Sequence, residues 1–96
     1  MQGGKLRNVA DDTCKRLGRV IRRRREALDI SQEQLAALAG IHRTYVSSIE
    51  LGKVRLGLEI AEKVADGLGF PLSELLAETE GTSSRRPGLS KRKKAK

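Results

Sequence analysis

Gly40 interrupts a run of apolar residues at helical spacing, and this break constrains the fold more than any other feature of the chain. Before the break, Ser31 and Gln34 have the spacing of a capping box, in which each side chain binds a backbone N–H of the other residue. Gly40 suits the left-handed conformation that commonly ends a helix. After it, apolar residues again recur at helical spacing. We therefore predict two short helices, over residues 31–39 and 43–50, joined by a tight turn.

His42 stands at the capping position of the second of these helices. Ile41 before it and Val46 within the helix have the spacing of a hydrophobic staple. Gly52 is expected to end the helix, and the segment LGKVRLG to form a loop. Only three residues of GIHRTYVSSIE are firmly apolar, so most of the surface of this helix is free for another role.

The rest of the chain continues the helical pattern and shows no alternation typical of strands. Further apolar repeats indicate three more helices: one capped by Asp12 or Thr13 and ending near Asp29, one from about Leu58 to Gly69, and a short one from Pro71 through Leu76. Aromatic residues make up 2% of the chain, so the core must be aliphatic, which favours packed helices. We expect one all-α domain of five helices over residues 13–79, preceded by a flexible arm over residues 1–12.

Basic residues are concentrated near the end of the chain. The formal net charge is +8, and residues 80–96 carry seven basic residues against one acidic residue. We expect this tail to be disordered, because its few apolar residues cannot offset the entropy of ordering it. A second basic cluster occupies residues 22–25, and both clusters suggest a polyanionic partner, either nucleic acid or an anionic membrane. We interpret the tail as a DNA-binding arm that adds affinity without sequence information; a solubilising end and a nuclear address are alternatives.

The sequence lacks the residues that several classes of function require. Cys14 is the only cysteine and His42 the only histidine, so we expect no disulfide, no metal site and no cofactor. There is no Gly-rich phosphate loop and no nucleophile with a base, so we expect no catalytic residues and no enzyme. No apolar run is long enough to span a membrane, and the first residues lack the apolar core of a signal peptide. A cytoplasmic protein without a membrane partner is therefore expected.

The two short helices and their glycine-containing turn have the local pattern of a helix-turn-helix. The segment SQEQLAALAGIHRTYVSSIELGK resembles the helix-turn-helix family of the phage Cro and repressor proteins, also called the xenobiotic-response-element family. The resemblance covers roughly residues 15–77 and rests on Gln32, Leu35, Ala36, Gly40, Val46, Ile49, Glu50 and Gly52. HRTYVSSIE is especially similar to the controller proteins of restriction–modification systems. The resemblance implies a lambda-repressor-like fold and a regulator of transcription that binds double-stranded DNA.

A recognition helix must pack one stripe on its domain and present another to the major groove. At about 100° per residue, the free residues of the third helix fall within an arc of roughly 140°. These residues are Arg43, Thr44, Ser47, Ser48 and Leu51. The resemblance implies that Arg43, Thr44 and Ser48 read base edges, with Ser47 adjacent. Arg43 can donate two hydrogen bonds to guanine, and Thr44 can meet a thymine methyl group.

Other positions of the family bind the DNA backbone. The resemblance implies phosphate contacts from Ser31 and Gln32 at the start of the second helix, where N–H groups favour an anion. Tyr45, at the edge of the free arc, could hydrogen-bond a phosphate, and Lys53 and Arg55 in the following loop are candidates for backbone contacts.

An ion pair inside the domain also follows from the resemblance, between an arginine of the first helix and Glu50. Periodicity places Arg24 and Arg25 on either flank of the apolar stripe and cannot choose between them. The resemblance implies Arg25. The chain departs from the family at His42, which replaces Ser or Thr, at Leu51, which replaces Asn, and in VRLGLE, which replaces an Asn-Pro-Ser-type helix start.

The family often forms dimers through its last helices. The resemblance therefore implies a homodimer formed around Leu72, Leu75 and Leu76, bound to a palindromic operator, although the same leucines could instead close the core of their own chain. Control would come from concentration, a regulatory protein partner or the chain's own promoter. The alternative hypothesis is an antitoxin-like or bridging module that uses the same fold mainly to bind proteins.

Overall fold

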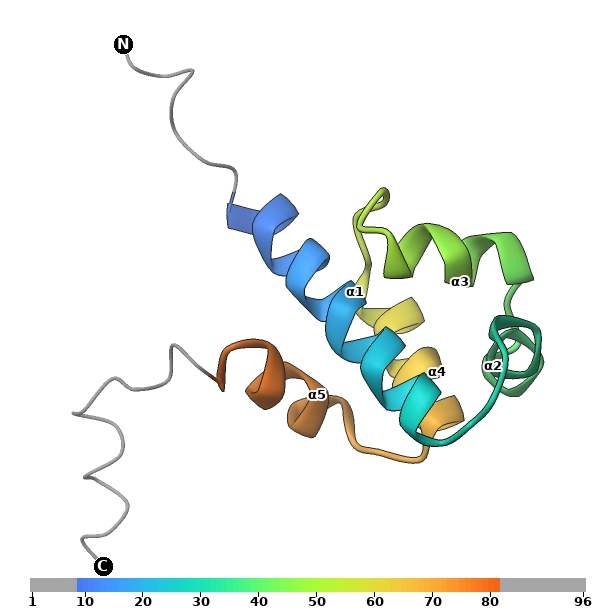
Figure 1. Cartoon of the computed structure of the whole chain (residues 1–96). Helices are drawn as coiled ribbons and strands as arrows, with labels where there is room; N and C mark the ends of the chain where they lie inside the picture. The colour runs from blue at the N-terminus through green and yellow to red at the C-terminus, as the bar shows by residue number, and fades with distance from the viewer. Residues whose placement is uncertain (1–8, 82–96) are drawn as a thin grey trace, which may run out of the picture.

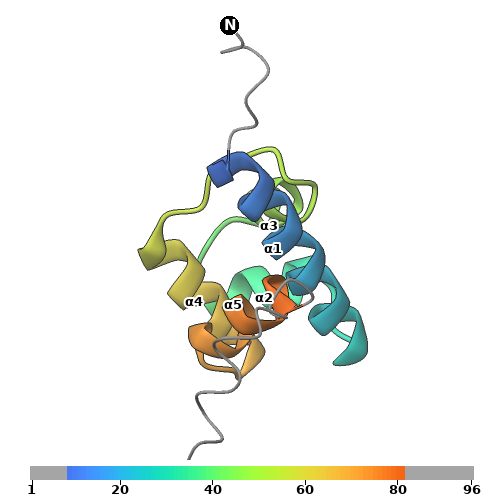
Figure 2. The same ribbon diagram turned by 90° about the vertical axis from the view of Figure 1, so that its left-hand side faces the viewer.

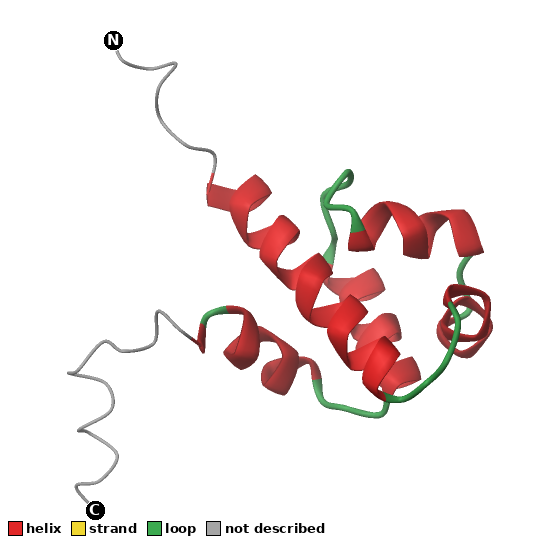
Figure 3. Ribbon diagram, viewed as in Figure 1, coloured by secondary structure: helices red, strands yellow, loops and turns green. Residues whose placement is uncertain are grey.

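Five helices account for most of residues 9–81, the part of the chain that the computed structural model describes (Figure 1). They are α1 (Val9–Ala27), α2 (Gln32–Ala39), α3 (Arg43–Glu50), α4 (Leu58–Leu68) and α5 (Leu72–Thr79). No strand occurs within the described residues, and the segments between helices are loops and turns (Figure 3). The prediction of an all-α, five-helix fold is confirmed.

The first helix begins earlier than its sequence indicates. α1 starts at Val9, so the prediction of a cap at Asp12 or Thr13 was wrong. No glycine or proline separates Val9 from Thr13, and extending a formed helix gains one hydrogen bond for each residue fixed, whereas starting one fixes several residues for a single bond. Residues 9–12 therefore belong to the helix rather than to the predicted arm. Residues 1–8 and 82–96, which contain the rest of the arm and nearly all of the basic tail, lie outside the described residues.

The turn between α2 and α3 has the predicted caps. Ser31 Oγ accepts a hydrogen bond from the Gln34 N–H at 2.9 Å, and Gln34 Oε1 accepts one from the Ser31 N–H at 2.7 Å. Gly40 follows α2 with φ +74°, in the left-handed region that a side chain rarely adopts. His42 caps α3, because its Nδ1 accepts from the Thr44 N–H at 3.4 Å. Local hydrogen bonds therefore fix both the start of α2 and the start of α3.

Each helix contributes one large, fully buried side chain to the core: Ile21, Leu35, Val46, Val64 and Leu75. Fully burying an aliphatic side chain of this size stabilises a fold by about 1.5–3 kcal/mol. The main packing contacts join α2 to α3 and α4, and α1 to α3 and α5. Figure 1 shows the C-terminal end of α3 next to the middle of α1, and α5 along the other side of the same helix. α1 therefore connects the helix-turn-helix to the last helix.

Arginines of the run at 22–25 hold α5 against α1. Arg23 Nη2 donates to Glu78 Oε2 at 2.8 Å. Arg24 Nε donates to Glu78 Oε1 at 2.7 Å and Arg24 Nη1 to Glu74 Oε2 at 3.2 Å. The Arg24 guanidinium also lies 4.2 Å from the centre of the Phe70 ring, a cation–π contact.

The other two arginines of the run also have carboxylate partners: Arg22 pairs with Glu26 at 3.0 Å, and Arg25 pairs with Glu50 of α3. The interpretation of this run as a surface for a polyanion therefore needs correction. Its charges are largely balanced within the chain.

The ion pairs of Glu78 predict how stability depends on pH. Hydrogen bonds from Arg23 and then from Arg24 lower the pKa of Glu78 below its ordinary value of 4.5. A carboxylate with a lowered pKa stabilises the fold above its unfolded pKa, and this contribution is lost as the pH falls through the folded pKa. The side chain of Glu78 is 31% exposed, so we expect Glu78→Gln to cost about 0.2–1 kcal/mol at pH 7.

Thermal unfolding of both proteins at pH 7 and near pH 3 measures this effect. The difference in Tm between wild type and Glu78→Gln should shrink at the lower pH, because protonation of the wild-type carboxyl removes the same ion pairs. A difference of the same size at both pH values would contradict the role given to these ion pairs.

Candidate nucleic-acid interface

One face of α3 is anchored to the domain. Val46 and Ile49 are buried against the rest of the core, and Tyr45 is half-buried and packs on the same cluster. Gly18 of α1 lies under the end of α3, where a Cβ atom would collide with the carbonyl oxygen of Ile49. The absence of a side chain at position 18 therefore allows α1 and α3 to cross closely.

The other face of α3 is available to a ligand. Arg43 and Thr44 are exposed, and Ser47 and Ser48 are half-buried. These four residues are among the five that helical periodicity places within one arc of α3. Within the described residues the side chain of Arg43 has no hydrogen bond and no ion pair, so its five N–H groups can bind a partner.

Thr44 has a more restricted role, because His42 engages its hydroxyl group. Thr44 Oγ1 lies 3.0 Å from His42 Nδ1. In the neutral ring tautomer with Nδ1 unprotonated, the hydroxyl donates its hydrogen to His42 and can only accept from a ligand. An acceptor beside a methyl group matches the amino group of adenine or cytosine and the methyl group of thymine.

A buried carboxylate sets the position of the end of α3. The side chain of Glu50 is 2% exposed, and Arg25 binds it through two nitrogens: Nε donates to Oε2 at 2.7 Å and Nη2 to Oε1 at 3.1 Å. Arg25 Nη1 also donates to the Ile30 carbonyl oxygen at 2.8 Å. Arg25 rather than Arg24 therefore forms the inward pair, and it connects α1 to both α3 and the start of the helix-turn-helix.

Gln32 contributes a third donor to the same carboxylate. Its Nε2 donates to Glu50 Oε1 at 3.0 Å, across the turn between α2 and α3. Gln32 was expected to bind phosphate, but one N–H of its amide is already engaged within the domain. Its other side-chain N–H and the free backbone N–H groups at the start of α2 remain available to an anion. Sequence reasoning missed this contact, because no local pattern links residues 18 positions apart.

Lys53 and Arg55 lie on the loop after α3, and both are exposed. Gly52 starts this loop with φ +74°, and the Lys53 N–H donates to the Ser48 carbonyl oxygen at 2.9 Å. Leu51 is also exposed, at the end of the free face of α3. The loop therefore continues the candidate surface beyond the end of α3.

The leucines predicted to form the dimer differ in accessibility. Leu75 is 1% exposed and belongs to the core of its own chain, while Leu72 is half-buried against that core. Leu76 is 36% exposed. Leu75 is thus too deeply buried to contact a second chain, and only Leu76 offers much surface.

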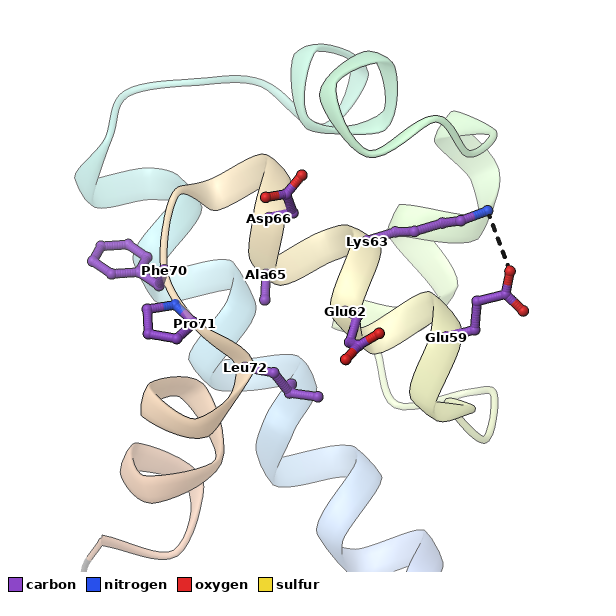
Figure 4. Close-up of a pocket in the computed structure, with 8 residues that line it drawn as sticks. All are labelled: Glu59, Glu62, Lys63, Ala65, Asp66, Phe70, Pro71 and Leu72. Carbon is purple, nitrogen blue, oxygen red and sulfur yellow. Dashed lines mark ion pairs between the residues drawn. The ribbon is translucent and has the colours of Figure 1, made fainter.

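A shallow hollow between α4 and the start of α5 is acidic, and Figure 4 shows the side chains that line it. Glu59, Glu62 and Asp66 contribute carboxylates, and the only basic group there, Lys63, lies 3.8 Å from Glu59. Such a surface repels phosphate. Among residues 9–81 there is also no group of three or more His, Cys, Asp or Glu side chains that could hold a metal ion, and no helix long and apolar enough to cross a membrane.

The geometry around Glu50 predicts a graded loss of stability. We expect Arg25→Ala to cost about 3–5 kcal/mol, because it leaves a buried carboxylate without its cation. Gln32→Ala removes one hydrogen bond to a charged group and should cost about 1.5–3 kcal/mol. Denaturant unfolding monitored by circular dichroism measures both. Arg24→Ala is the matched control, because its carboxylate partners are more exposed; a loss as large as that of Arg25→Ala would contradict the central role of Glu50.

Comparisons with known proteins agree with this geometry. A family model described as helix-turn-helix matches residues 21–75, more than half of the chain. The control protein C.MunI from a Mycoplasma species is 49% identical over 57 residues, which cover 59% of this chain and 77% of that protein. The control protein C.BamHI from Bacillus amyloliquefaciens is 42% identical over 48 residues, covering 50% of this chain and 59% of that protein.

Two solved structures share the fold. The restriction-modification controller protein C.AhdI from Aeromonas hydrophila superposes with a TM-score of 0.63 and 35% identity, over 65% of this chain and 94% of that chain. The clp gene regulator ClgR from C. glutamicum has a TM-score of 0.69 and 23% identity, over 77% of this chain and 96% of that chain, and supports the fold alone. The prediction that the chain is not an enzyme is confirmed, because the matches are to regulatory proteins. Because the family model matches residues 21–75 and the controller proteins are similar in sequence, the chain belongs to the Cro and repressor type of the helix-turn-helix family, whose members are DNA-binding regulators of transcription.

Proposed function

We propose that this protein is a sequence-specific regulator of transcription that binds a palindromic operator as a homodimer in the cytoplasm. The observation that carries the proposal is α3 itself, which is fixed to the domain along one face and through Glu50, and free along the other. A helix held in this way can enter the major groove in one orientation, which sequence readout requires.

Arg43 is the principal reader in this proposal. It begins α3, it is exposed, and it has no carboxylate partner within the described residues. A bidentate contact with guanine discriminates against other bases by about 1–3 kcal/mol. Thr44, limited to accepting a hydrogen bond, and the short Ser47 and Ser48 read neighbouring bases at close approach or through water. Ser31 and Gln32 at the start of α2, together with Tyr45, Lys53 and Arg55, position the helix on the backbone.

The size of α3 supports binding as a dimer. α3 has eight residues and is therefore about 12 Å long, so one copy contacts only a few base pairs. Specific binding exceeds non-specific binding by about 4–10 kcal/mol, which is more than one strong contact and a few weak ones supply. Two copies on half-sites about 34 Å apart double the readout. The exposed Leu76 on α5 is the member of the predicted leucine set that is available for the interface.

The relatives support the regulatory role. C.MunI and C.BamHI are control proteins and C.AhdI is a restriction-modification controller, and we propose that this chain likewise controls transcription. We also propose that the basic tail, residues 80–96, adds affinity that does not depend on sequence.

A titration of the full chain with two duplexes at two salt concentrations tests the proposal. One duplex carries the region upstream of the protein's own gene, and the other has the same length and a random sequence. We expect the upstream duplex to bind at least about 10³-fold more tightly. A ratio near one would overturn the proposal and favour the alternative, an antitoxin-like or bridging module that binds proteins.

Arg43→Ala should relax base preference at one position in each half-site, because the variant loses the bidentate donor. We expect a loss of about 1–3 kcal/mol of discrimination there, with preference elsewhere unchanged. Affinities for a set of single-base operator variants measure it. Lys63→Ala, which removes a positive charge from the acidic hollow, is the control. If Arg43→Ala weakens all sequences equally, Arg43 binds phosphate rather than a base.

A further inference from the structure

Two basic residues of α1 differ from the arginines that follow them. Lys15 and Arg19 are exposed, and because they are four positions apart in a helix they lie on one face. Within the described residues neither has an ion pair or a side-chain hydrogen bond, whereas each arginine at 22–25 has a carboxylate partner. No carboxylate within the described residues therefore balances the charges of Lys15 and Arg19, which are available to an external anion.

Three contacts place this part of α1 beside the end of α3 and the loop after it. A Cβ atom built on Gly52 would lie 2.6 Å from Lys15 Cγ and 3.2 Å from Lys15 Cα, so the stem of Lys15 packs on this glycine. Cys14 Sγ accepts a hydrogen bond from the Leu56 N–H at 3.4 Å. Gly18 lies against the carbonyl oxygens of Ile49 and Glu50. Figures 1 and 2 both show the N-terminal half of α1 next to this loop.

The loop that Lys15 touches also carries Lys53, which is exposed and directly follows Gly52. Lys15 lies at this loop and Arg19 follows it by about one helical turn on α1, so we treat Lys15, Arg19 and Lys53 as one basic edge that extends from the loop onto α1. The edge ends at Arg22, whose guanidinium is paired with Glu26. An edge of this kind suits the regular row of phosphates along one strand of a duplex.

We propose that Lys15 and Arg19 bind phosphates of the DNA that flanks the bases read by α3. This inference rests on the proposed function, and it extends the backbone contact beyond the loop residues Lys53 and Arg55. The two side chains add affinity and fix the protein along the duplex without selecting a sequence. The footprint on the backbone is therefore longer than α2, α3 and their loop alone would give.

The salt dependence of DNA binding tests the proposal. Each phosphate contact releases condensed counterions, so losing one should reduce the slope of log K against log salt by about one per bound copy. We expect Lys15→Gln and Arg19→Gln each to have this effect and the double variant to show the sum. Lys63→Gln, an equal change of charge on an exposed lysine in the acidic hollow, should leave the slope nearly unchanged.

Duplex length provides a second, independent measurement. Shortening the duplex until it lacks the flanking phosphates should reduce the slope for the wild type by the same amount, and should not affect the double variant. A slope that Lys15→Gln/Arg19→Gln does not change, or that Lys63→Gln changes as much, would overturn the proposal.

The fold of each variant is checked by thermal unfolding. A lower Tm with an unchanged slope would mean that Lys15 instead stabilises the C-terminal end of α3, where a cation is favourable. Random duplex reports the slope as well as operator does, because phosphate contacts do not depend on sequence. The basic edge can therefore pass or fail this test whether or not the protein proves to be sequence-specific.

Discussion

The buried carboxylate of Glu50 is the interaction on which the arrangement of the helix-turn-helix depends. Arg25 reaches it from α1 and Gln32 from α2, while Glu50 itself ends α3. A charged group removed from water is tolerated only when donors replace the water it has lost. The observed arrangement of these three helices brings both donors to Glu50, and moving α3 away from them would leave the carboxylate buried without partners. The pair therefore selects the orientation of α3 more than it adds net stability.

The same chain uses its basic residues for two different purposes. Those of the run at 22–25 face carboxylates, and they hold α5, α3 and α1 together. Arg43, Lys53, Lys15 and Arg19 have no such partner within the described residues, and they lie on α3, on its following loop and on the neighbouring part of α1. The acidic hollow on α4 carries the opposite sign. Within the described residues, positive and negative charges therefore gather on different parts of the surface, and in the proposed function the duplex approaches the unpaired cations.

Much of the fold could be read from local patterns. The capping box at Ser31 and Gln34, the left-handed glycine at position 40 and the apolar repeats each act within a few residues, so the sequence shows them directly. The start of α1 could not be read in this way, because no residue between Val9 and Thr13 breaks a helix, and the favourable cap at Asp12 or Thr13 was not used. The sequence also left open which leucine of α5 is buried, because three leucines in a short helix do not reveal which of them faces the core.

The sequence by itself determined that this chain forms helices, where α2 and α3 begin, and which residues of α3 share its free face. Periodicity and caps decide these points, since they depend on neighbours one or two turns away. Only the tertiary structure decided that Gln32 donates to Glu50, that the arginine run is balanced internally, and that Lys15 lies against Gly52. Apart from the local Arg22–Glu26 pair, these contacts join residues 18 to 55 positions apart, and they form only once the buried side chains have fixed how the helices cross.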